Sequence, residues 1–293
     1  MTSIDNVIKQ LESDTGKSLQ NCHIASISGG SINTAYSLRT KKLSWFVKLN
    51  CSNLLSMFEA EAQGLKEMAA SNTVRIPEVI TSGRSGDQAY LVLEYIELKS
   101  LGTRPAKLLG QQLATLHQQP QPYFGWHVDN TIGSTPQHND RTADWVNFWR
   151  HERLGRQLQF ASKNGYGGSL QTKGEKLLNG LDVFFSNYDP APALLHGDLW
   201  GGNAASDTQG NPVIFDPACY YGDRETDIAM TELFGGFGSE FAASYRASYP
   251  LDAGYTVRKT LYNLYHILNH LNLFGSSYLS QAEGMIEQLV AEL

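Results

Sequence analysis

The segment from Leu194 to Asn203, LLHGDLWGGN, constrains the fold of this chain more than any other feature of its sequence. An apolar run leads into a glycine-rich turn in which a carboxylate, Asp198, and a side-chain amide, Asn203, stand five residues apart. This pattern is typical of a buried strand that ends in a loop presenting polar side chains. Asp and Asn also cap backbone groups in ordinary turns, so a structural role for both residues is the alternative.

The order and spacing of these residues resemble the catalytic loop of protein kinases, which reads H-R-D-L-x-x-x-N. In that loop the Asp accepts the proton of the attacking hydroxyl group and the Asn holds a magnesium ion on the nucleotide. We therefore predict that Asp198 is the catalytic base and that Asn203 binds Mg²⁺. Gly197 replaces the Arg that contacts a phosphorylated activation loop in protein kinases, which favours a small acceptor molecule over a protein segment.

A second magnesium-binding carboxylate is expected at the end of a strand that follows this loop. Residues 211–212 are a turn signal, residues 213–215 form a short apolar strand, and Asp216 ends it, thirteen residues after Asn203. Asp216 therefore occupies the place of the Asp in the D-F-G element, which binds the metal that bridges the phosphates. An Asp at a strand end can also be only a turn former.

The strand expected over residues 45–49 has one charged residue, Lys48, in an apolar run, and it resembles the V-A-I-K strand of kinases. Lys48 is predicted to contact the nucleotide phosphates, although a Lys in a strand more commonly lies at a solvated edge. Residues 56–59 match a capping box and predict the start of a helix. Glu61 would lie on its inward face and is assigned as the partner of Lys48, with Glu59 as the alternative.

Two further loops are predicted to contact the nucleotide. A glycine hairpin over residues 28–33 joins two segments with strand character, and its backbone N–H groups are placed to cover phosphates. Most Gly-Gly hairpins are only turns, so this assignment rests on its position ahead of Lys48. After the last N-terminal strand, backbone groups of a hinge segment are predicted to contact the edge of adenine. The residues concerned are Gly29, Gly30 and Ser31 in the hairpin and Glu94, Tyr95 and Ile96 in the hinge.

Composition excludes several classes of protein. With 41% hydrophobic residues the 293-residue chain can build a full core. Its net charge is −6, so the chain lacks the positive electrostatic field expected of a general nucleic-acid-binding protein. The N-terminus has an amphipathic helical pattern that differs from a secretory signal, and no apolar stretch approaches membrane-spanning length. The three cysteines, Cys22, Cys51 and Cys219, are odd in number and lack C-x-x-C spacing, which argues against disulfides and zinc and favours a cytoplasmic location.

The distribution of patterns along the chain predicts two lobes. Residues 1–96 read as strands around one helix and are expected to form the nucleotide-binding lobe. Residues 97–293 show helical apolar stripes and are expected to form a larger lobe that contains the catalytic and metal-binding loops. The predicted fold class is α+β, a protein-kinase-like two-lobe fold with the active site between the lobes. The sequence does not indicate an oligomeric state.

At the level of whole motifs, the chain resembles the fructosamine kinase (ketosamine-3-kinase) family, which is related to aminoglycoside phosphotransferases. The matching segments span nearly the whole chain: residues 29–32, 57–61, Asn130 with 133–137, Trp145, 196–203 and 216–230. Some relatives have Cys in the nucleotide loop where this chain has Ser31. That departure puts any redox switch through this position in doubt here, but not a kinase activity.

The resemblance implies an ATP- and Mg²⁺-dependent kinase that transfers phosphate to the 3-hydroxyl of a ketosamine, the adduct formed when a sugar glycates an amine. Because the product is unstable and sheds the sugar, the implied role is deglycation, with fructosamine or ribulosamine adducts as substrates. The sequence does not show which sugar is preferred, or whether the amine belongs to a protein or to a free metabolite. The alternatives are another small-molecule kinase of the same fold, of the aminoglycoside or choline type, and a non-catalytic nucleotide-binding protein.

Three residues are predicted to border the acceptor. Trp200 offers an aromatic face to the sugar, although a Trp at this position can equally pack into the core. Asp223 and Glu225 follow the metal-binding segment and are predicted to receive the cationic amine. Asp227 is expected to hydrogen-bond the backbone of the catalytic loop instead, and His196 is expected to be structural.

Overall fold

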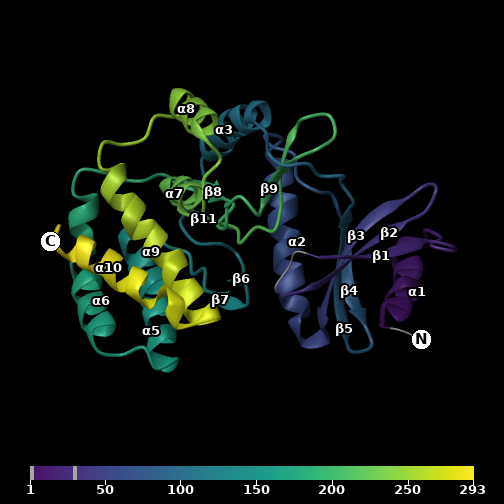
Figure 1. The fold of residues 1–293 in the computed structure, drawn as a ribbon, viewed down its shortest axis with the longest axis horizontal. Coiled ribbons are helices and arrows are strands. Elements are labelled where there is room, and N and C mark those ends of the chain that lie inside the picture. Colours follow the sequence, from purple (N-terminus) through teal and green to yellow (C-terminus); the bar gives the residue numbers. More distant parts are fainter. Residues whose placement is uncertain (1–2, 29–31) are drawn as a thin grey trace.

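The computed structural model describes residues 3–28 and 32–293, so the predicted phosphate-covering residues Gly29, Gly30 and Ser31 lie outside the described residues. The chain forms a β-rich N-terminal part and a larger, mainly helical C-terminal part, as expected for an α+β fold (Figure 1). Helix α2 (Leu55–Ala70) lies between the sheet and the helical part, and α1 (Ser3–Thr15) lies on the opposite side of the sheet.

A five-stranded antiparallel sheet organises the N-terminal part, in the order β1-β2-β3-β5-β4. Its strands are β1 (His23–Ile27), β2 (Thr34–Arg39), β3 (Ser44–Cys51), β4 (Val79–Ser85) and β5 (Gln88–Glu94). Strand β5 shows how both faces are filled. Tyr90 and Val92 pack with α1, whereas Leu91 and Leu93 pack with α2, because alternate residues of a strand point to opposite faces.

Two local predictions in this part were wrong. The capping box over residues 56–59 does not begin α2, because a 3₁₀ turn over Ser52–Leu54 leads directly into a helix that starts at Leu55, and the N-cap residue Leu54 makes no side-chain hydrogen bond. Among the strands expected within residues 1–96, the one that the sequence places over residues 75–81 begins only at Val79. Pro77 lies in the part of this segment that is not a strand, and it has no N–H group to donate to the hydrogen bonds of a sheet.

The C-terminal part is built around α9 (Tyr255–Phe274), whose inward residues, including Leu261, Leu264 and Leu268, are fully buried. Its other elements are α3 (Thr103–His117), β6 (Asn130–Ile132), β7 (Thr135–Gln137), α4 (Trp145–Phe148), a π-helix (Trp149–Leu154), α5 (Gly155–Lys163), α6 (Ser169–Asn179), a 3₁₀ helix (Leu181–Phe185), β8 (Pro192–Leu195), β9 (Ala204–Ser206), β10 (Pro212–Ile214), β11 (Tyr220–Asp223), α7 (Glu225–Leu233), α8 (Ser239–Ser248), a 3₁₀ turn (Ser276–Tyr278) and α10 (Leu279–Val290).

Two short antiparallel pairs place the predicted loops. Strand β8 pairs with β11, and β9 pairs with β10. The segment 196–203 connects β8 to β9, and Asp216 follows β10, so both loops leave the same small region of β structure. The predicted division of the chain at residue 96 falls in the connection between β5 and α3 and stays a prediction. Within residues 3–28 and 32–293, no helix is both long and apolar enough to cross a membrane.

Candidate active site

Lys48 is the meeting point of the two parts of the chain. It lies on β3 and is 5% exposed, and its Nζ atom is 2.7 Å from Glu61 Oε1 on α2 and 2.5 Å from Asp216 Oδ1 in the helical part. Burial alone would lower the pKa of Lys48, but the charges of Asp216 and Glu61 outweigh burial and raise that pKa above its ordinary value. The ion pair expected between Lys48 and Glu61 is therefore present, and Lys48 is a cation.

Asn203 links the two predicted loops. Its Nδ2 atom donates to the backbone oxygen of Asp198 (2.8 Å), to the Asp198 carboxylate (3.2 Å) and to the backbone oxygen of Asp216 (3.4 Å). Burial, followed by the charge of Asp216, raises the pKa of the Asp198 carboxyl to about 7, against the opposing effect of the Asn203 hydrogen bond. A carboxyl group that titrates near neutral pH is suited to accept a proton from a hydroxyl group.

Asp216 adopts a left-handed backbone conformation, with φ of +57°. L-residues other than Gly, Asn and Asp rarely adopt this conformation, because it brings Cβ close to backbone oxygen atoms. Its side chain is 45% exposed even though one carboxylate oxygen contacts the buried Lys48. Asp216 therefore joins the ion pair on one side and is accessible to a ligand on the other.

The backbone of the predicted catalytic loop, residues 196–203, is held by Asp227 of α7. The Asp227 carboxylate accepts hydrogen bonds from the amides of His196 (2.8 Å) and Gly197 (2.9 Å), as predicted, and it contacts His117 Nε2 of α3 at 3.2 Å. The buried His196 ring donates from Nε2 to the Phe215 carbonyl (2.9 Å), which confirms its structural position. Burial lowers the pKa of His196, so the ring is neutral.

Gly197 is required by close packing. Its φ is +80°, and a Cβ atom at this position would lie 2.1 Å from the carbonyl oxygen of Ala218. The Arg of protein kinases therefore does not fit here, because the segment after Asp216 packs directly against the catalytic loop.

Trp200 and the two acids predicted for the acceptor lie in different environments. Trp200 is 40% exposed, and its ring packs edge-on against Phe234, with centroids 6.3 Å apart. Phe234 in turn contacts His270 of α9, with centroids 4.9 Å apart. Trp200 is thus accessible beside the catalytic loop instead of buried in the core.

The prediction that Asp223 and Glu225 border the acceptor is wrong, because both residues are fully buried. Asp223 accepts hydrogen bonds from the hydroxyl groups of Tyr188 (2.9 Å) and Tyr262 (2.5 Å). Glu225 pairs with Arg258 of α9 at 2.8 Å. Strand β11 turns directly into α7, and this turn directs both carboxylates into the helical core.

In the predicted hinge, the local sheet already uses two of the three amides. The amide of Glu94 donates to the Glu78 carbonyl (2.8 Å), and that of Tyr95 donates to the Ser44 carbonyl (3.1 Å). Within the described part of the chain, the amide of Ile96 has no such backbone partner. Among the three residues of the predicted hinge, Ile96 is therefore the one whose N–H group is not used by the sheet.

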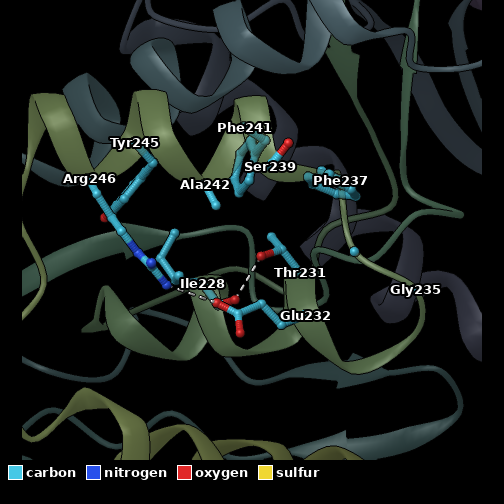
Figure 2. Close-up of a pocket in the computed structure, with 12 residues that line it drawn as sticks. Ile228, Thr231, Glu232, Gly235, Phe237, Ser239, Phe241, Ala242, Tyr245 and Arg246 are labelled. Atoms are coloured by element: carbon cyan, nitrogen blue, oxygen red, sulfur yellow. Dashed lines mark hydrogen bonds and ion pairs between the residues drawn. The ribbon is translucent and has the colours of Figure 1, made fainter.

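A separate cavity of about 430 Å³ lies between α7, α8 and the glycine-rich turn at residues 235–238. In Figure 2, the Arg246 side chain extends toward Glu232 from one side, and Phe237 lies on the opposite side of the view. None of the site residues predicted from the sequence lines it. This cavity is distinct from the cluster of Lys48, Asp198 and Asp216.

The fructosamine kinase family model matches residues 3–292, nearly the whole chain. The chain belongs to the fructosamine kinase family. A "Probable ketoamine kinase" from Synechocystis is 45% identical over 283 residues, which cover 96% of this chain and 95% of that protein. The chloroplastic "Protein-ribulosamine 3-kinase" of Oryza sativa subsp. japonica is 42% identical over 293 residues, which cover 99% of this chain and 85% of that protein.

Solved structures of fructosamine kinases and more distant kinases share the fold. A "Putative fructosamine-3-kinase" from Haemophilus somnus superposes with a TM-score of 0.89 at 30% identity, covering 98% of this chain and 97% of that chain. A thermostable mutant of aminoglycoside phosphotransferase APH(4)-Ia superposes with a TM-score of 0.64 at 16% identity over 98% of both chains, a likeness of fold alone. The chain therefore has the kinase-like two-lobe fold and is an enzyme of the fructosamine kinase family.

Proposed function

We propose that this chain is an ATP-dependent kinase that phosphorylates the 3-hydroxyl group of ketosamines, with deglycation of fructosamine or ribulosamine adducts as its role. One observation carries the proposal: Lys48, Asp216, Asn203 and Asp198 form a continuous chain of contacts between the two parts of the fold. The printed names of the family members, ketoamine kinase and protein-ribulosamine 3-kinase, support the acceptor class.

In the proposed reaction, Asp198 orients the sugar hydroxyl group and accepts its proton. Its pKa of about 7 allows it to be ionised before the reaction and protonated after it. Lys48 neutralises charge on the phosphates, and Glu61 holds Lys48 in position. Catalysis then depends mainly on positioning and on electrostatic stabilisation of the transferred phosphoryl group.

The residues present fit a magnesium ion that binds together with the nucleotide. Mg²⁺ prefers oxygen ligands and is usually bound by one or two protein groups plus phosphates, and here the half-exposed Asp216 carboxylate and the Asn203 amide oxygen would hold it. Among the described residues no cluster of three or more His, Cys, Asp or Glu side chains forms a protein-only metal site. When bound, the ion would neutralise charge on the phosphates.

Asp216→Ala and Asn203→Ala should therefore raise the Mg²⁺ concentration needed for half-maximal turnover. If both variants saturate with Mg²⁺ as the parent does, the metal assignment is wrong.

Two other contacts belong to the proposal. At the nucleotide end, Ile96 would donate its amide to adenine, and the hairpin at residues 29–31 would cover the phosphates. At the acceptor end, the accessible ring of Trp200 would stack on the sugar-amine.

A reducing cytoplasm suits the three cysteines, which are all free.

An ADP-release assay with ATP and Mg²⁺ tests the proposed function. We expect turnover with ribulosamine, erythrulosamine or fructosamine adducts and little with choline or kanamycin, with Asp198→Asn as the inactive control. Turnover confined to kanamycin or choline would assign the chain to another acceptor class of the same fold. No turnover with any acceptor, from a protein that binds ADP, would indicate a nucleotide-binding protein without this activity.

A further inference from the structure

The short β6–β7 hairpin contacts the residues that follow Asp216. Asn130 at the start of β6 donates from Nδ2 to the Cys219 carbonyl oxygen at 2.7 Å. Gln137 at the end of β7 donates from Nε2 to the Ala218 carbonyl oxygen at 3.1 Å and to Asn130 Oδ1 at 2.8 Å. These two side chains, here called the amide clamp, therefore hold two successive carbonyl groups of the segment after Asp216.

The amide clamp is itself fixed by buried partners. Tyr265 of α9 donates its hydroxyl hydrogen to Gln137 Oε1 at 2.8 Å. Asn139 donates to Asn130 Oδ1 at 3.0 Å, and Arg153 donates to Asn139 Oδ1 at 2.7 Å. Gln137, Asn139 and Arg153 are at most 2% exposed. Because the acceptor oxygens of both clamp amides are occupied, their N–H groups are oriented toward the Ala218 and Cys219 carbonyls.

The same segment is fixed from the opposite side by the catalytic loop. The Ala218 amide donates to the His196 carbonyl oxygen at 2.8 Å, and the Ala218 carbonyl lies against the Cα of Gly197. The Ala218 peptide groups thus join the catalytic loop to the amide clamp. Asp216, two residues earlier, is in the left-handed conformation, which needs support from its surroundings to persist.

We propose that Gln137 and Asn130 are positioning residues that hold Asp216 in the conformation that binds metal and nucleotide. The inference rests on the proposed function, since it concerns the same Mg²⁺ and ATP. In protein kinases, phosphorylation orders the activation loop that follows the metal-binding Asp. Here a fixed hairpin contacts that segment through hydrogen bonds, so the metal-binding turn is assembled before any ligand binds.

The test is nucleotide binding measured by calorimetry in the presence and absence of Mg²⁺. We expect Gln137→Met to weaken binding of ADP with Mg²⁺ by roughly 10- to 100-fold, a range typical for groups that orient metal ligands. Binding of ADP without Mg²⁺ should change less, because Lys48 keeps Glu61 as a partner even if Asp216 moves. The matched control is Gln171→Met on α6, since Gln171 Nε2, like Gln137 Nε2, donates two hydrogen bonds, in this case to the carbonyls of Leu158 and Tyr166.

A folded Gln137→Met protein with the parent's affinity for Mg²⁺ and ADP would overturn the proposal. An equal loss in Gln171→Met would also overturn it, because the effect would then be one of general stability. Hydrogen exchange on the ligand-free parent gives a measurement that needs no variant: the Ala218 amide should be strongly protected, and rapid exchange would contradict the proposal. A parent that binds ADP with Mg²⁺ but phosphorylates no ketosamine would refute the proposed function alone.

Discussion

Two pairs of carboxylates lie within 28 residues of each other and are used in opposite ways. Asp198 and Asp216 lie in the two loops that Asn203 joins, where Asp216 contacts Lys48, which is also the partner of Glu61. Asp223 and Glu225 lie in the helical core, where Arg258 and two tyrosine hydroxyl groups surround them. The fold provides charged and hydroxyl partners for the carboxylates of Asp223 and Glu225. The charges of Asp198 and Asp216 are compensated only in part.

This difference separates stability from function. A buried charge with hydrogen-bonded partners maintains the fold, and removing one partner leaves the other uncompensated. A site with too few partners is costly for the folded protein but is ready for a cation or a proton. Exchanging carboxylates for amides in the two regions should therefore have opposite consequences for stability and turnover.

The largest expected effect is on turnover in Asp198→Asn, roughly 10²- to 10⁴-fold, because the general base is lost. The same substitution should stabilise the fold near pH 8. The folded-state pKa of Asp198 is raised, so ionisation of this group destabilises the folded protein progressively as pH rises from about 4 to 7. Thermal melts should show the stability gain at pH 8 and no gain near pH 4. Near-parental turnover of the folded variant would remove Asp198 from the base role.

The core pair should respond in the reverse way. We expect Glu225→Ala to lower the free energy of unfolding by about 3 kcal/mol, because Arg258 loses a buried partner and retains Asp252. Both KM values should match those of the parent at a temperature where the variant is folded. Urea denaturation measures the change in the free energy of unfolding, and steady-state kinetics measure the two KM values. The matched control is Glu287→Gln, since the Glu287 pair with Lys173 is exposed and should contribute little.

A double-mutant cycle on Lys48→Met and Glu61→Gln tests whether the Lys48 ammonium group and the Glu61 carboxylate act as a pair. Each single change should raise the KM for ATP or lower kcat, and the two losses should be non-additive by about 0.5–3 kcal/mol. Glu59→Gln, on the exposed face of α2, is the control and should behave as the parent does. Strictly additive losses would show that Lys48 and Glu61 do not act together.

The raised pKa of Asp198 also predicts the acid side of the pH profile. Since the ionised form is the base, kcat/KM should fall about tenfold per pH unit below a midpoint near 7. Bound Mg²⁺ should lower the midpoint seen in kcat, because a nearby cation favours the carboxylate. The residual activity of Asp198→Asn should not show this fall at acid pH. A flat parental profile between pH 5.5 and 7.5 would exclude the assignment.

The smallest expected effect concerns Trp200→Ala, which should weaken acceptor use by about 1 kcal/mol of stacking energy. The KM for the ketosamine should rise while the KM for ATP stays constant. Steady-state kinetics in which each substrate is varied separately make this distinction. Equal changes in both values would place Trp200 outside the acceptor site.

Residues fixed by local spacing could be predicted from the sequence. Asp198 and Asn203 follow from one loop, and Glu61 follows from the helical face that it shares with the core, even though the capping box used to place that helix was wrong. The direction of a chain after a motif could not be predicted in this way. Asp223 and Glu225 are close to Asp216 in sequence, but the pairing of β11 with β8 turns them into the core.

Contacts between distant segments were beyond the reach of sequence reasoning. Asn130 and Gln137 were noted as part of the family resemblance, without a role, because the carbonyls they contact are 89 and 81 residues away. Nothing in a Gln or an Asn indicates which peptide oxygen it will meet. The hydrogen bonds from the loop backbone to Asp227 could be predicted because Asp227 begins the apolar run at residues 228–230, whereas its partner His117 gave no signal.

Because Asp227 holds the loop at residues 196–203 through its backbone amides, the position of Asp198, the proposed base, depends on α7 and not on the exposed side chains of the loop. Asp227 receives two loop amides and is itself supported from α3. The exposed side chain of Trp200, a residue of this loop, is then free to change without displacing Asp198. Engineering a new acceptor preference into this chain should therefore begin with the side chains of Trp200 and Phe234 and leave the rest of the loop and its supports from α3 and α7 unaltered.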